Sequence, residues 1–183
     1  PLQVMHINEI KSFTDQWIGN NYFQDDEIRL ILEKSMLKNL NASYGAWDKN
    51  SLIAVRLTFA PGSWISSFEK GITPSSWKVS TNEVGYFKSL FVAKDFQGKS
   101  LGKKISDQSI SVLKEMGAKA IICHSWLESP NNSSQRYLKN MGFEEIKNHP
   151  LFWNDIDYHC TRCGPKKCIC TAQEMILYLN EGT

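Results

Sequence analysis

Apolar and polar positions along the first half of the chain follow helical spacing in some stretches and strand spacing in others. Residues 2–7 alternate weakly, which predicts a short opening strand. After Asn8, which suits a helix N-cap, apolar residues recur at helical spacing. A second helix is predicted over residues 24–40, where three acidic residues precede an apolar stripe. Residues 42–47 and 51–60 predict two strands joined by a tight turn.

The second half of the chain predicts strands and helices in alternation. A strand over 84–92, a helix over 101–116 and a strand over 119–124 favour a right-handed crossover between parallel strands. The remaining predicted elements are a helix over 131–141 that ends at Gly142, a strand over 143–146 and a strand over 174–179. This order predicts an α/β (α+β) domain with a mixed sheet.

A long segment, residues 61–82, separates two of the predicted strands. It is rich in Ser, Gly and Pro and carries Trp64 and Trp77. Loops of this length in compact domains are usually functional or mobile. The alternative is a plain insertion whose two tryptophans pack on the body of the protein, and the sequence leaves both interpretations open.

Composition and charge restrict the class of protein. The chain has 183 residues, 42% of them hydrophobic, and a net charge of +2. These values suggest one ordinary globular domain, and they argue against disorder and against a dedicated nucleic-acid binder. The best apolar run, Leu52 to Ala60, is interrupted by Arg56, so no membrane partner is predicted. No secretory signal is visible, so we expect a cytoplasmic protein, although Pro1 does not tell whether the natural N-terminus is present.

Candidate chemistry first emerges at the turn between the strand over 84–92 and the helix that follows it. The turn is Gln97-Gly98-Lys99-Ser100-Leu101-Gly102, and Lys103 and Lys104 come next. Small residues let the backbone approach a ligand, and the free amides of a helix start attract anions. The turn therefore predicts a pyrophosphate cradle, with a mere tight turn as the alternative. Its glycine spacing matches neither the Walker loop nor the dinucleotide fingerprint.

Two blocks of sequence resemble the Gcn5-related N-acetyltransferase (GNAT) superfamily. The acetyl-CoA motif of that family runs Arg or Gln, two residues, Gly, one residue, then Gly or Ala. Gln97 to Gly102 resembles it, with Ser100 where the first Gly is usual. Residues 131–143, which end in Gly142-Phe143, resemble the second conserved block. In element order the resemblance covers residues 2–146.

The resemblance implies an acyl-CoA N-acyltransferase fold over residues 1–150, with 151–183 as a cysteine-rich knuckle and closing strand of the same domain. It implies transfer of an acetyl group from acetyl-CoA to a small-molecule or peptide amine. A bulge in the strand over 84–92 would splay it from the next strand and admit the pantetheine arm. The residues implied in cofactor binding are Phe91, Val92, Gln97, Gly98, Lys99, Ser100, Leu101, Gly102, Lys103, Asn131 and Ser134. The alternatives are another acyl-CoA donor, or a CoA-binding module without catalysis.

Candidate catalytic residues are few. Glu83 and Tyr86 lie where relatives often carry a base or a water relay, with a solvated loop residue and a packed aromatic as the alternatives. In many relatives a Tyr four residues before the Gly of Gly-Phe acts as the general acid for the leaving thiolate, and this chain has Leu138 at that position. Tyr137 is one residue off, about 100° around the helix, so we do not expect it to protonate the leaving thiolate. His124 either faces the cleft or is hydrogen-bonded structure, and Cys123 is expected to be a buried apolar residue.

Four of the five cysteines crowd together near the C-terminus. Cys160 and Cys163 form a C-x-x-C pair followed by Gly164 and Pro165, and Cys168 and Cys170 follow closely. Four thiolates satisfy a tetrahedral zinc ion, so a structural zinc site is predicted. An iron–sulfur cluster, disulfides and unligated thiols are the alternatives.

Overall fold

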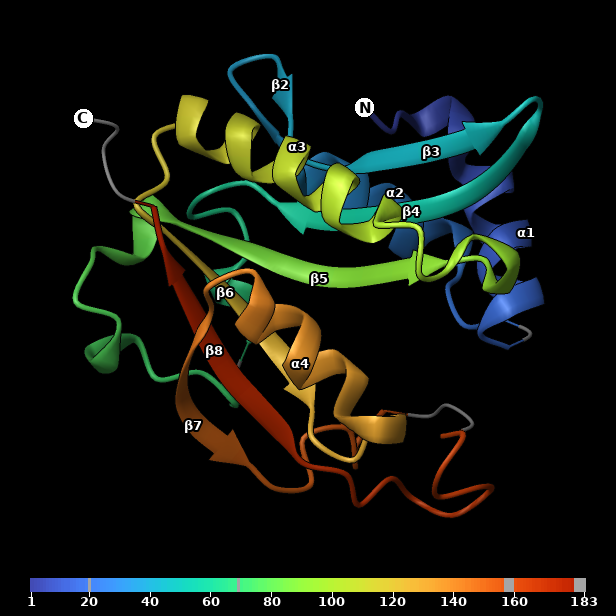
Figure 1. Ribbon diagram of the computed structural model, residues 1–183. Coiled ribbons are helices and arrows are strands. Elements are labelled where there is room, and N and C mark those ends of the chain that lie inside the picture. Colours follow the sequence, from blue (N-terminus) through green and yellow to red (C-terminus); the bar gives the residue numbers. More distant parts are fainter. Residues whose placement is uncertain (20, 69, 157–159, 180–183) are drawn as a thin grey trace.

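The computed structural model describes residues 1–183 except 20, 69, 157–159 and 180–183. Four α-helices and a six-stranded sheet form its framework, with short 3-10 turns between them (Figure 1). The bounds are α1 (Ile7–Trp17), α2 (Asp25–Lys34), β1 (Met36–Leu37), β2 (Leu40–Asn41), β3 (Tyr44–Asp48), β4 (Ser51–Phe59), β5 (Val84–Val92), α3 (Leu101–Glu115), β6 (Ala120–Trp126), α4 (Ser133–Asn140), β7 (Glu144–His149) and β8 (Ala172–Tyr178). The predicted appendage over 151–183 includes 157–159 and 180–183, which lie outside the described residues.

The large sheet is mixed, as predicted, and its strand order is β3-β4-β5-β6-β8-β7. Strands β5 and β6 run parallel and are joined by α3, which confirms the predicted crossover. The other neighbours run antiparallel, and β8 lies between β6 and β7 although it follows both in the chain. Because β5 and β6 are parallel, their C-terminal ends, which lead into α3 and α4, lie at the same end of the sheet.

The two faces of the sheet carry different helices (Figure 1). On one face, α1 and α2 bury Ile10 and Ile28 against Leu57 of β4. On the other face, α3 and α4 bury Leu113 and Leu138 in a second cluster with residues of β5 and β6. Alternating side chains of each strand supply both clusters, so the sheet has two cores and two chemically distinct faces.

Two sequence predictions in the N-terminal part are wrong. Residues 2–7 form a 3-10 turn and the start of α1, because the backbone N–H of Gln3 donates to Nδ1 of His6 and closes the chain into a turn. Helix α2 ends at Lys34 instead of continuing to residue 40. The hydroxyl of the buried Ser35 bonds the carbonyl of Ile31, and the chain then folds back through the β1–β2 hairpin.

The segment over 61–82 is anchored on the body of the protein. Trp64 and Trp77 are completely buried, and their ring centroids lie 5.7 Å apart. The indole of Trp64 donates to the carbonyl oxygen of Val84 over 2.8 Å. The aromatic packing that the sequence left open is therefore present. Across the described residues, every helix is too short or too polar to cross a membrane.

Candidate functional site

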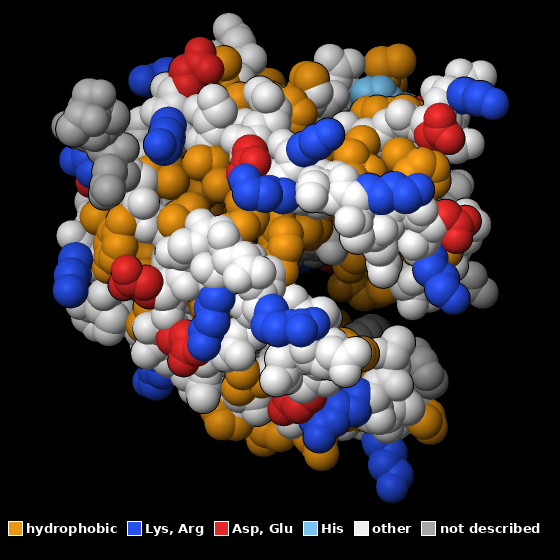
Figure 2. All heavy atoms as spheres, viewed as in Figure 1, with side chains coloured by type: hydrophobic (Ala, Val, Ile, Leu, Met, Phe, Trp, Pro, Cys, Tyr) orange, Lys and Arg blue, Asp and Glu red, His pale blue; other side chains and the backbone are white. Residues whose placement is uncertain are grey.

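A gap opens between the two parallel strands at the centre of the sheet. Strands β5 and β6 are paired from Val84 with Ala120 to Phe87 with Cys123, and beyond that pair they separate. The register of β5 against β4 shifts at the same point, which leaves Lys88 as the extra residue of a bulge. A bulge bends its strand, so it accounts for the separation. The space-filling view shows a hollow between the end of β5 and the start of α4, bordered by Lys and Arg side chains (Figure 2).

The predicted cradle lies at the open end of this gap. Gly98 has a φ of 73° and Ser100 a φ of 58°, so the turn uses the left-handed region at both positions. Ser100 occupies the N-cap of α3 without a side-chain capping bond, which leaves first-turn amides of α3 available. Gly102 lies against β5, where an added Cβ would stand 3.1 Å from Cδ2 of Leu90.

Three lysines surround the turn. Lys103 is paired with Asp107 over 2.7 Å on the same helix, and the ammonium of Lys99 lies 5.1 Å from the ring centroid of Phe96. Lys104 is exposed. The amide side chain of Gln97 donates to the carbonyl oxygen of Val92 and fixes the turn to the end of β5. The arrangement can hold an anion with backbone amides and place lysine side chains around it.

The second block of sequence reaches the same end of the gap. Asn131 and Asn132 have φ values of 54° and 52°, and α4 begins immediately after them. The amide of Ser134 donates to the hydroxyl of Ser129 over 3.2 Å. Since β5 and β6 are parallel, the starts of α3 and α4 flank one opening. Phe91, by contrast, turns its ring toward the face of α1 and α2, 5.6 Å from the ring of Tyr22.

Tyr86 and His124 form a hydrogen-bonded pair on the face of α1 and α2, beside the point where the strands separate. Nε2 of His124 lies 2.6 Å from the carbonyl oxygen of Gly71 and must donate to it, because a carbonyl only accepts. Nδ1 then accepts from the hydroxyl of Tyr86 over 2.9 Å. The ring of Phe152 stacks on His124 at 4.4 Å and encloses the pair.

Burial controls the protonation of this pair. It lowers the pKa of His124 to about 4, so the imidazole is neutral at pH 7. It also raises the pKa of the Tyr86 phenol above its usual value. Tyr86 therefore keeps its proton and donates a hydrogen bond to Nδ1 of His124. Since Nε2 of His124 donates to Gly71, both donors of the pair are engaged within the protein, and the chemistry open to the pair is positioning.

Glu174 is the centre of a polar network on the same face, and the sequence analysis did not single it out. It is completely buried on β8 and accepts four hydrogen bonds. The donors are the backbone and the hydroxyl of Thr73, the indole of Trp77 and Nε2 of His149, over 3.0, 2.6, 2.7 and 2.9 Å. Burial raises the pKa of this carboxyl, but the donors outweigh burial and the pKa lies below its usual value.

Glu83, the other predicted catalytic residue, lies apart from the gap, and the positions that were not expected to be catalytic are engaged elsewhere or buried. Glu83 precedes β5 and pairs with Lys119 over 2.7 Å, about 13 Å along the strand from the point of separation. The hydroxyl of Tyr137 lies 2.8 Å from Oγ of Ser106 and 3.2 Å from the carbonyl oxygen of Gly102, both on α3. Leu138 is buried in the core, as is Cys123, whose thiol pKa is raised by burial.

The four cysteines of the C-terminal segment converge. Their Sγ atoms all lie within 4.8 Å of one another, and two of the separations are 3.7 and 3.9 Å. Tetrahedral Zn–S bonds of about 2.3 Å require sulfur separations of about 3.8 Å. A disulfide would need about 2.05 Å, so none of these four cysteines is in a disulfide, and the spacing of their Sγ atoms suits a metal site. The Gly164 amide donates to the Cys160 carbonyl over 2.8 Å and forms the predicted knuckle turn.

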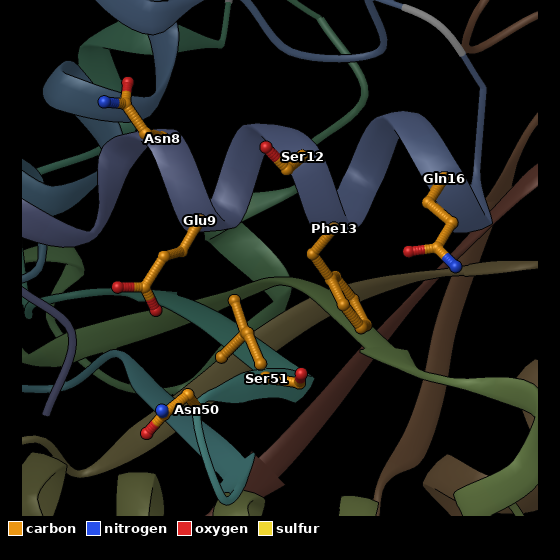
Figure 3. Close-up of a pocket in the computed structure, with 8 residues that line it drawn as sticks. Asn8, Glu9, Ser12, Phe13, Gln16, Asn50 and Ser51 are labelled. Carbon is orange, nitrogen blue, oxygen red and sulfur yellow. The ribbon is translucent and has the colours of Figure 1, made fainter.

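A shallow groove of about 330 Å³ lies between α1 and the start of β4 (Figure 3). Its polar lining includes Asn8, Ser12 and Asn50, and Glu9 is its one titratable group. The Glu9 carboxylate accepts a hydrogen bond from the indole of Trp47 over 2.7 Å. Strand β5 lies between this groove and the gap, so the groove adds nothing to the site.

The sheet thus combines a splayed parallel pair of strands with a turn of left-handed residues at the start of α3. Residues 10–143 match the sequence profile of the acetyltransferase (GNAT) family. The chain belongs to this family, which confirms the resemblance drawn from the two motifs. A comparison with curated proteins gave no match.

Solved structures share the fold across nearly the whole chain. The ribosomal-protein-S18-alanine N-acetyltransferase of Escherichia coli is 11% identical, with a TM-score of 0.67 and coverage of 100% of this chain and 93% of that one. The yncA protein of Salmonella typhimurium, solved with its cofactor acetyl-CoA, is 15% identical, with a TM-score of 0.64 and coverage of 99% of this chain and 92% of that one. The NatC complex bound to Gag peptide and CoA contains a chain that is 17% identical, with a TM-score of 0.69 and coverage of 98% of this chain and 96% of that one. These identities establish a common fold and leave the acceptor open.

Proposed function

We propose that this chain is an N-acyltransferase that takes its acyl group from a CoA thioester, with acetyl-CoA as the expected donor, and transfers it to an amine. The observation that carries the proposal is the coincidence of two features. The gap between β5 and β6 and the backbone cradle at the start of α3 open at the same end of the sheet. Each feature alone has structural explanations, whereas their combination suits an extended ligand with an anionic end.

The proposed cofactor path runs from the cradle into the gap. The amides from Gly98 to Lys103 hold the pyrophosphate, where the helix start and nearby lysines favour negative charge. Beyond Phe87, the edge of β5 that faces β6 has no strand partner. The amide groups of the pantetheine arm pair with this free edge around Phe91 and Val92, as an added strand would.

The proposed chemical step is direct attack by an unprotonated amine. The amine nitrogen bonds to the thioester carbonyl carbon and loses one proton, the C–S bond breaks, and CoA leaves as a thiolate that takes up one proton. Holding both reactants in the gap supplies much of the acceleration. Tyr86 is better placed than Glu83 to act through His124 near the reacting end of the cofactor. The acceptor remains a small-molecule or peptide amine.

The cradle can be tested with a pair of matched glycines. Gly98 and Gly117 both have positive φ values, 73° and 91°, and both face open space, but Gly117 lies at the far end of α3. Either Gly→Ala change forces a left-handed alanine and costs about 1 kcal/mol. We expect only Gly98→Ala to weaken acetyl-CoA binding, measured by titration calorimetry. Equal affinities of the two variants for acetyl-CoA would contradict the proposal that the Gly98 turn binds the pyrophosphate.

Turnover separates the enzyme from its rival, a CoA-binding module without catalysis. Release of free CoA thiol is measured with acetyl-CoA and a panel of peptide and small-molecule amines. Saturable, amine-dependent release supports the transferase. Tight CoA binding with no release above the rate without protein, across the panel, supports the module.

We also propose that Cys160, Cys163, Cys168 and Cys170 hold one structural zinc ion. The donor set fits, because four thiolates complete a tetrahedral shell and leave no position for a substrate. Arg162, whose guanidinium lies 3.9 Å from Sγ of Cys170, offsets part of the negative charge. Metal analysis of protein purified without added zinc should give about one equivalent. Absence of metal, with all four thiols alkylated freely in the folded protein, would exclude the site.

A further inference from the structure

Arg56 is a buried cation without a counter-charge. It lies on β4 and is only 3% exposed. Its Nε donates to Oγ of Ser106 over 2.9 Å, and its Cζ stands 4.1 Å from the ring centroid of Phe87. The hydroxyl of Tyr137 lies 2.8 Å from the same Oγ of Ser106. No carboxylate in the described part of the chain pairs with Arg56.

Such an arrangement is costly in a folded protein. Charged side chains are almost never fully buried unless they are paired, because an unpaired ion in the interior forfeits several kcal/mol of solvation. Burial lowers the pKa of Arg56, but an arginine stays protonated in proteins. The two hydroxyls and the ring that surround it are neutral, so the positive charge is not cancelled by the protein. A carboxylate supplied from outside would cancel it.

The position of the guanidinium indicates where that carboxylate would come from. Phe87, over which it lies, belongs to the last pair of residues before β5 and β6 separate. Ser106 lies one helical turn beyond Gly102 of the cradle, and Tyr137 approaches from α4. The backbone of Arg56 pairs with Leu90, but its guanidinium lies over Phe87 of β5, at the level where the gap closes and on the face of α3 and α4. The cradle lies at the open end.

A second polar group at the gap also lacks a partner. Ser125 is completely buried, and its hydroxyl has no hydrogen-bond partner. It lies on β6 two residues after Cys123, so it shares the face of Cys123 and comes just beyond the last β5–β6 pair. Buried hydroxyls without partners are rare in native proteins. Ser125 thus lacks a hydrogen-bond partner and Arg56 lacks a counter-charge, and a bound carboxylate would supply both.

We propose that the acyl end of the cofactor site binds a CoA thioester whose acyl chain ends in a carboxylate. Such a donor is the mono-thioester of a short dicarboxylic acid. The inference rests on the proposed acyl-CoA site and extends its donor beyond acetyl. A cofactor that enters from the cradle brings its acyl chain to the closed end last, where Arg56 meets it. A guanidinium binds a carboxylate through two parallel hydrogen bonds, and Ser125 supplies a further donor.

The reaction that follows is the same transfer with a different product. The amine nitrogen bonds to the thioester carbonyl carbon and loses one proton, the C–S bond breaks, and CoA leaves as a thiolate that takes up one proton. The terminal carboxylate takes no part and remains on the product. An amine that was positively charged would leave the enzyme as an amide carrying a negative charge.

Binding of donors alone tests the inference, because it needs no acceptor. Dissociation constants of acetyl-CoA, butyryl-CoA and succinyl-CoA are measured by calorimetry with the unmodified chain, Arg56→Met, Arg56→Lys and Arg136→Met. Arg136 is an exposed arginine of α4 and serves as the matched control. We expect succinyl-CoA to bind the unmodified chain at least tenfold more tightly than butyryl-CoA, which matches its carbon chain without the charge. Arg56→Met should abolish this preference, Arg56→Lys should keep part of it, and Arg136→Met should leave it intact.

The outcomes are distinguishable from failure of the proposed function. Binding of all three thioesters without a preference for succinyl-CoA overturns the inference and leaves the acyltransferase standing. Binding of none of them removes both. A structural role for Arg56 predicts instead that Arg56→Met weakens all donors equally and lowers the unfolding temperature. We expect that temperature to stay level or to rise, because a buried unpaired charge is removed. A fall in that temperature combined with equal loss for all donors overturns the inference.

Discussion

The two faces of the sheet differ in what they place beside the gap: a backbone turn on one face and a network of polar side chains on the other. On the side of α3 and α4, the cradle consists of backbone, and six consecutive residues from Gln97 to Gly102 build it. On the side of α1 and α2, the polar network consists of side chains. It joins Thr73 to Glu174 across 101 positions of sequence. A ligand site made of local backbone tolerates drift in its side chains, whereas a network of side chains depends on every member being present.

The largest expected effect lies in the side-chain network. Glu174→Leu leaves the donors of Thr73, Trp77 and His149 buried without an acceptor. We expect a loss of about 3–5 kcal/mol in the free energy of unfolding, measured in urea. The matched control is Glu145→Gln on neighbouring β7, where a surface pair with Lys139 is removed and less than about 1 kcal/mol is expected. Similar losses for both would show that the network carries no special weight.

The next effect concerns pH. The pKa of His124 is about 4 in the folded chain and about 6.5 in the unfolded one, so the unfolded chain binds the proton first as the pH falls. The stabilisation from the neutral ring is complete above about pH 6.5 and is lost progressively as the pH falls from about 6.5 to about 4, by a total of up to about 3 kcal/mol. His124→Gln keeps a donor and an acceptor but does not titrate.

The unfolding free energies of the two proteins are compared at pH 7 and pH 5. The decrease in unfolding free energy from pH 7 to pH 5 should be smaller in His124→Gln, because glutamine does not titrate. The neighbouring Glu174, His149 and Tyr86 are present in both proteins, so their contributions cancel in the comparison. Zinc loss at low pH, if it occurs, also affects both proteins. An identical decrease would mean that His124 is already solvated in the folded chain.

A smaller effect tests whether Tyr137 belongs to the chemistry. Tyr137→Phe removes the hydroxyl that contacts Ser106 and Gly102, which should cost about 0.5–1.5 kcal/mol of stability. Turnover should fall less than tenfold, which corresponds to less than about 1.4 kcal/mol of barrier. A hundredfold loss of turnover with unchanged cofactor affinity would identify this phenol as the acid for the leaving thiolate.

The smallest effect sharpens the picture of the cradle. An alanine at Gly102 meets only the tip of the Leu90 side chain, 3.1 Å from the new Cβ. The gain in helix propensity, about 1 kcal/mol, offsets the small displacement of Leu90. We therefore expect Gly102→Ala to leave unfolding free energy within about 1 kcal/mol of the original. A bulky residue at the same position should displace β5 and weaken acetyl-CoA binding.

The difference between the two faces also explains what the sequence could predict. The turn from Gln97 to Gly102, the crossover through α3 and the cysteine knuckle are local, so residue type and spacing were enough. Ser35 ended α2 early through a contact with Ser43, which helical periodicity does not encode. Glu174 stands in an apolar stretch of β8 and Arg56 in an apolar stretch of β4. A charge within a buried strand is a visible signal, but its partner depends on the folded topology.

The place of β8 in the sheet has a consequence for how the protein is made. Strand β8 separates β6 from β7, yet its residues, 172–178, follow both in the chain. A ribosome therefore releases the cradle and both helices of its face before the strand that completes the sheet exists. Until then β6 has an open edge, and Thr73 and Trp77 lack the Glu174 carboxylate that accepts their hydrogen bonds. Pairing across such distances is slow, and an unpaired apolar edge invites association with other chains. A chain whose synthesis is arrested before residue 172 should therefore bind chaperones through its exposed β6 edge and should not bind the cofactor.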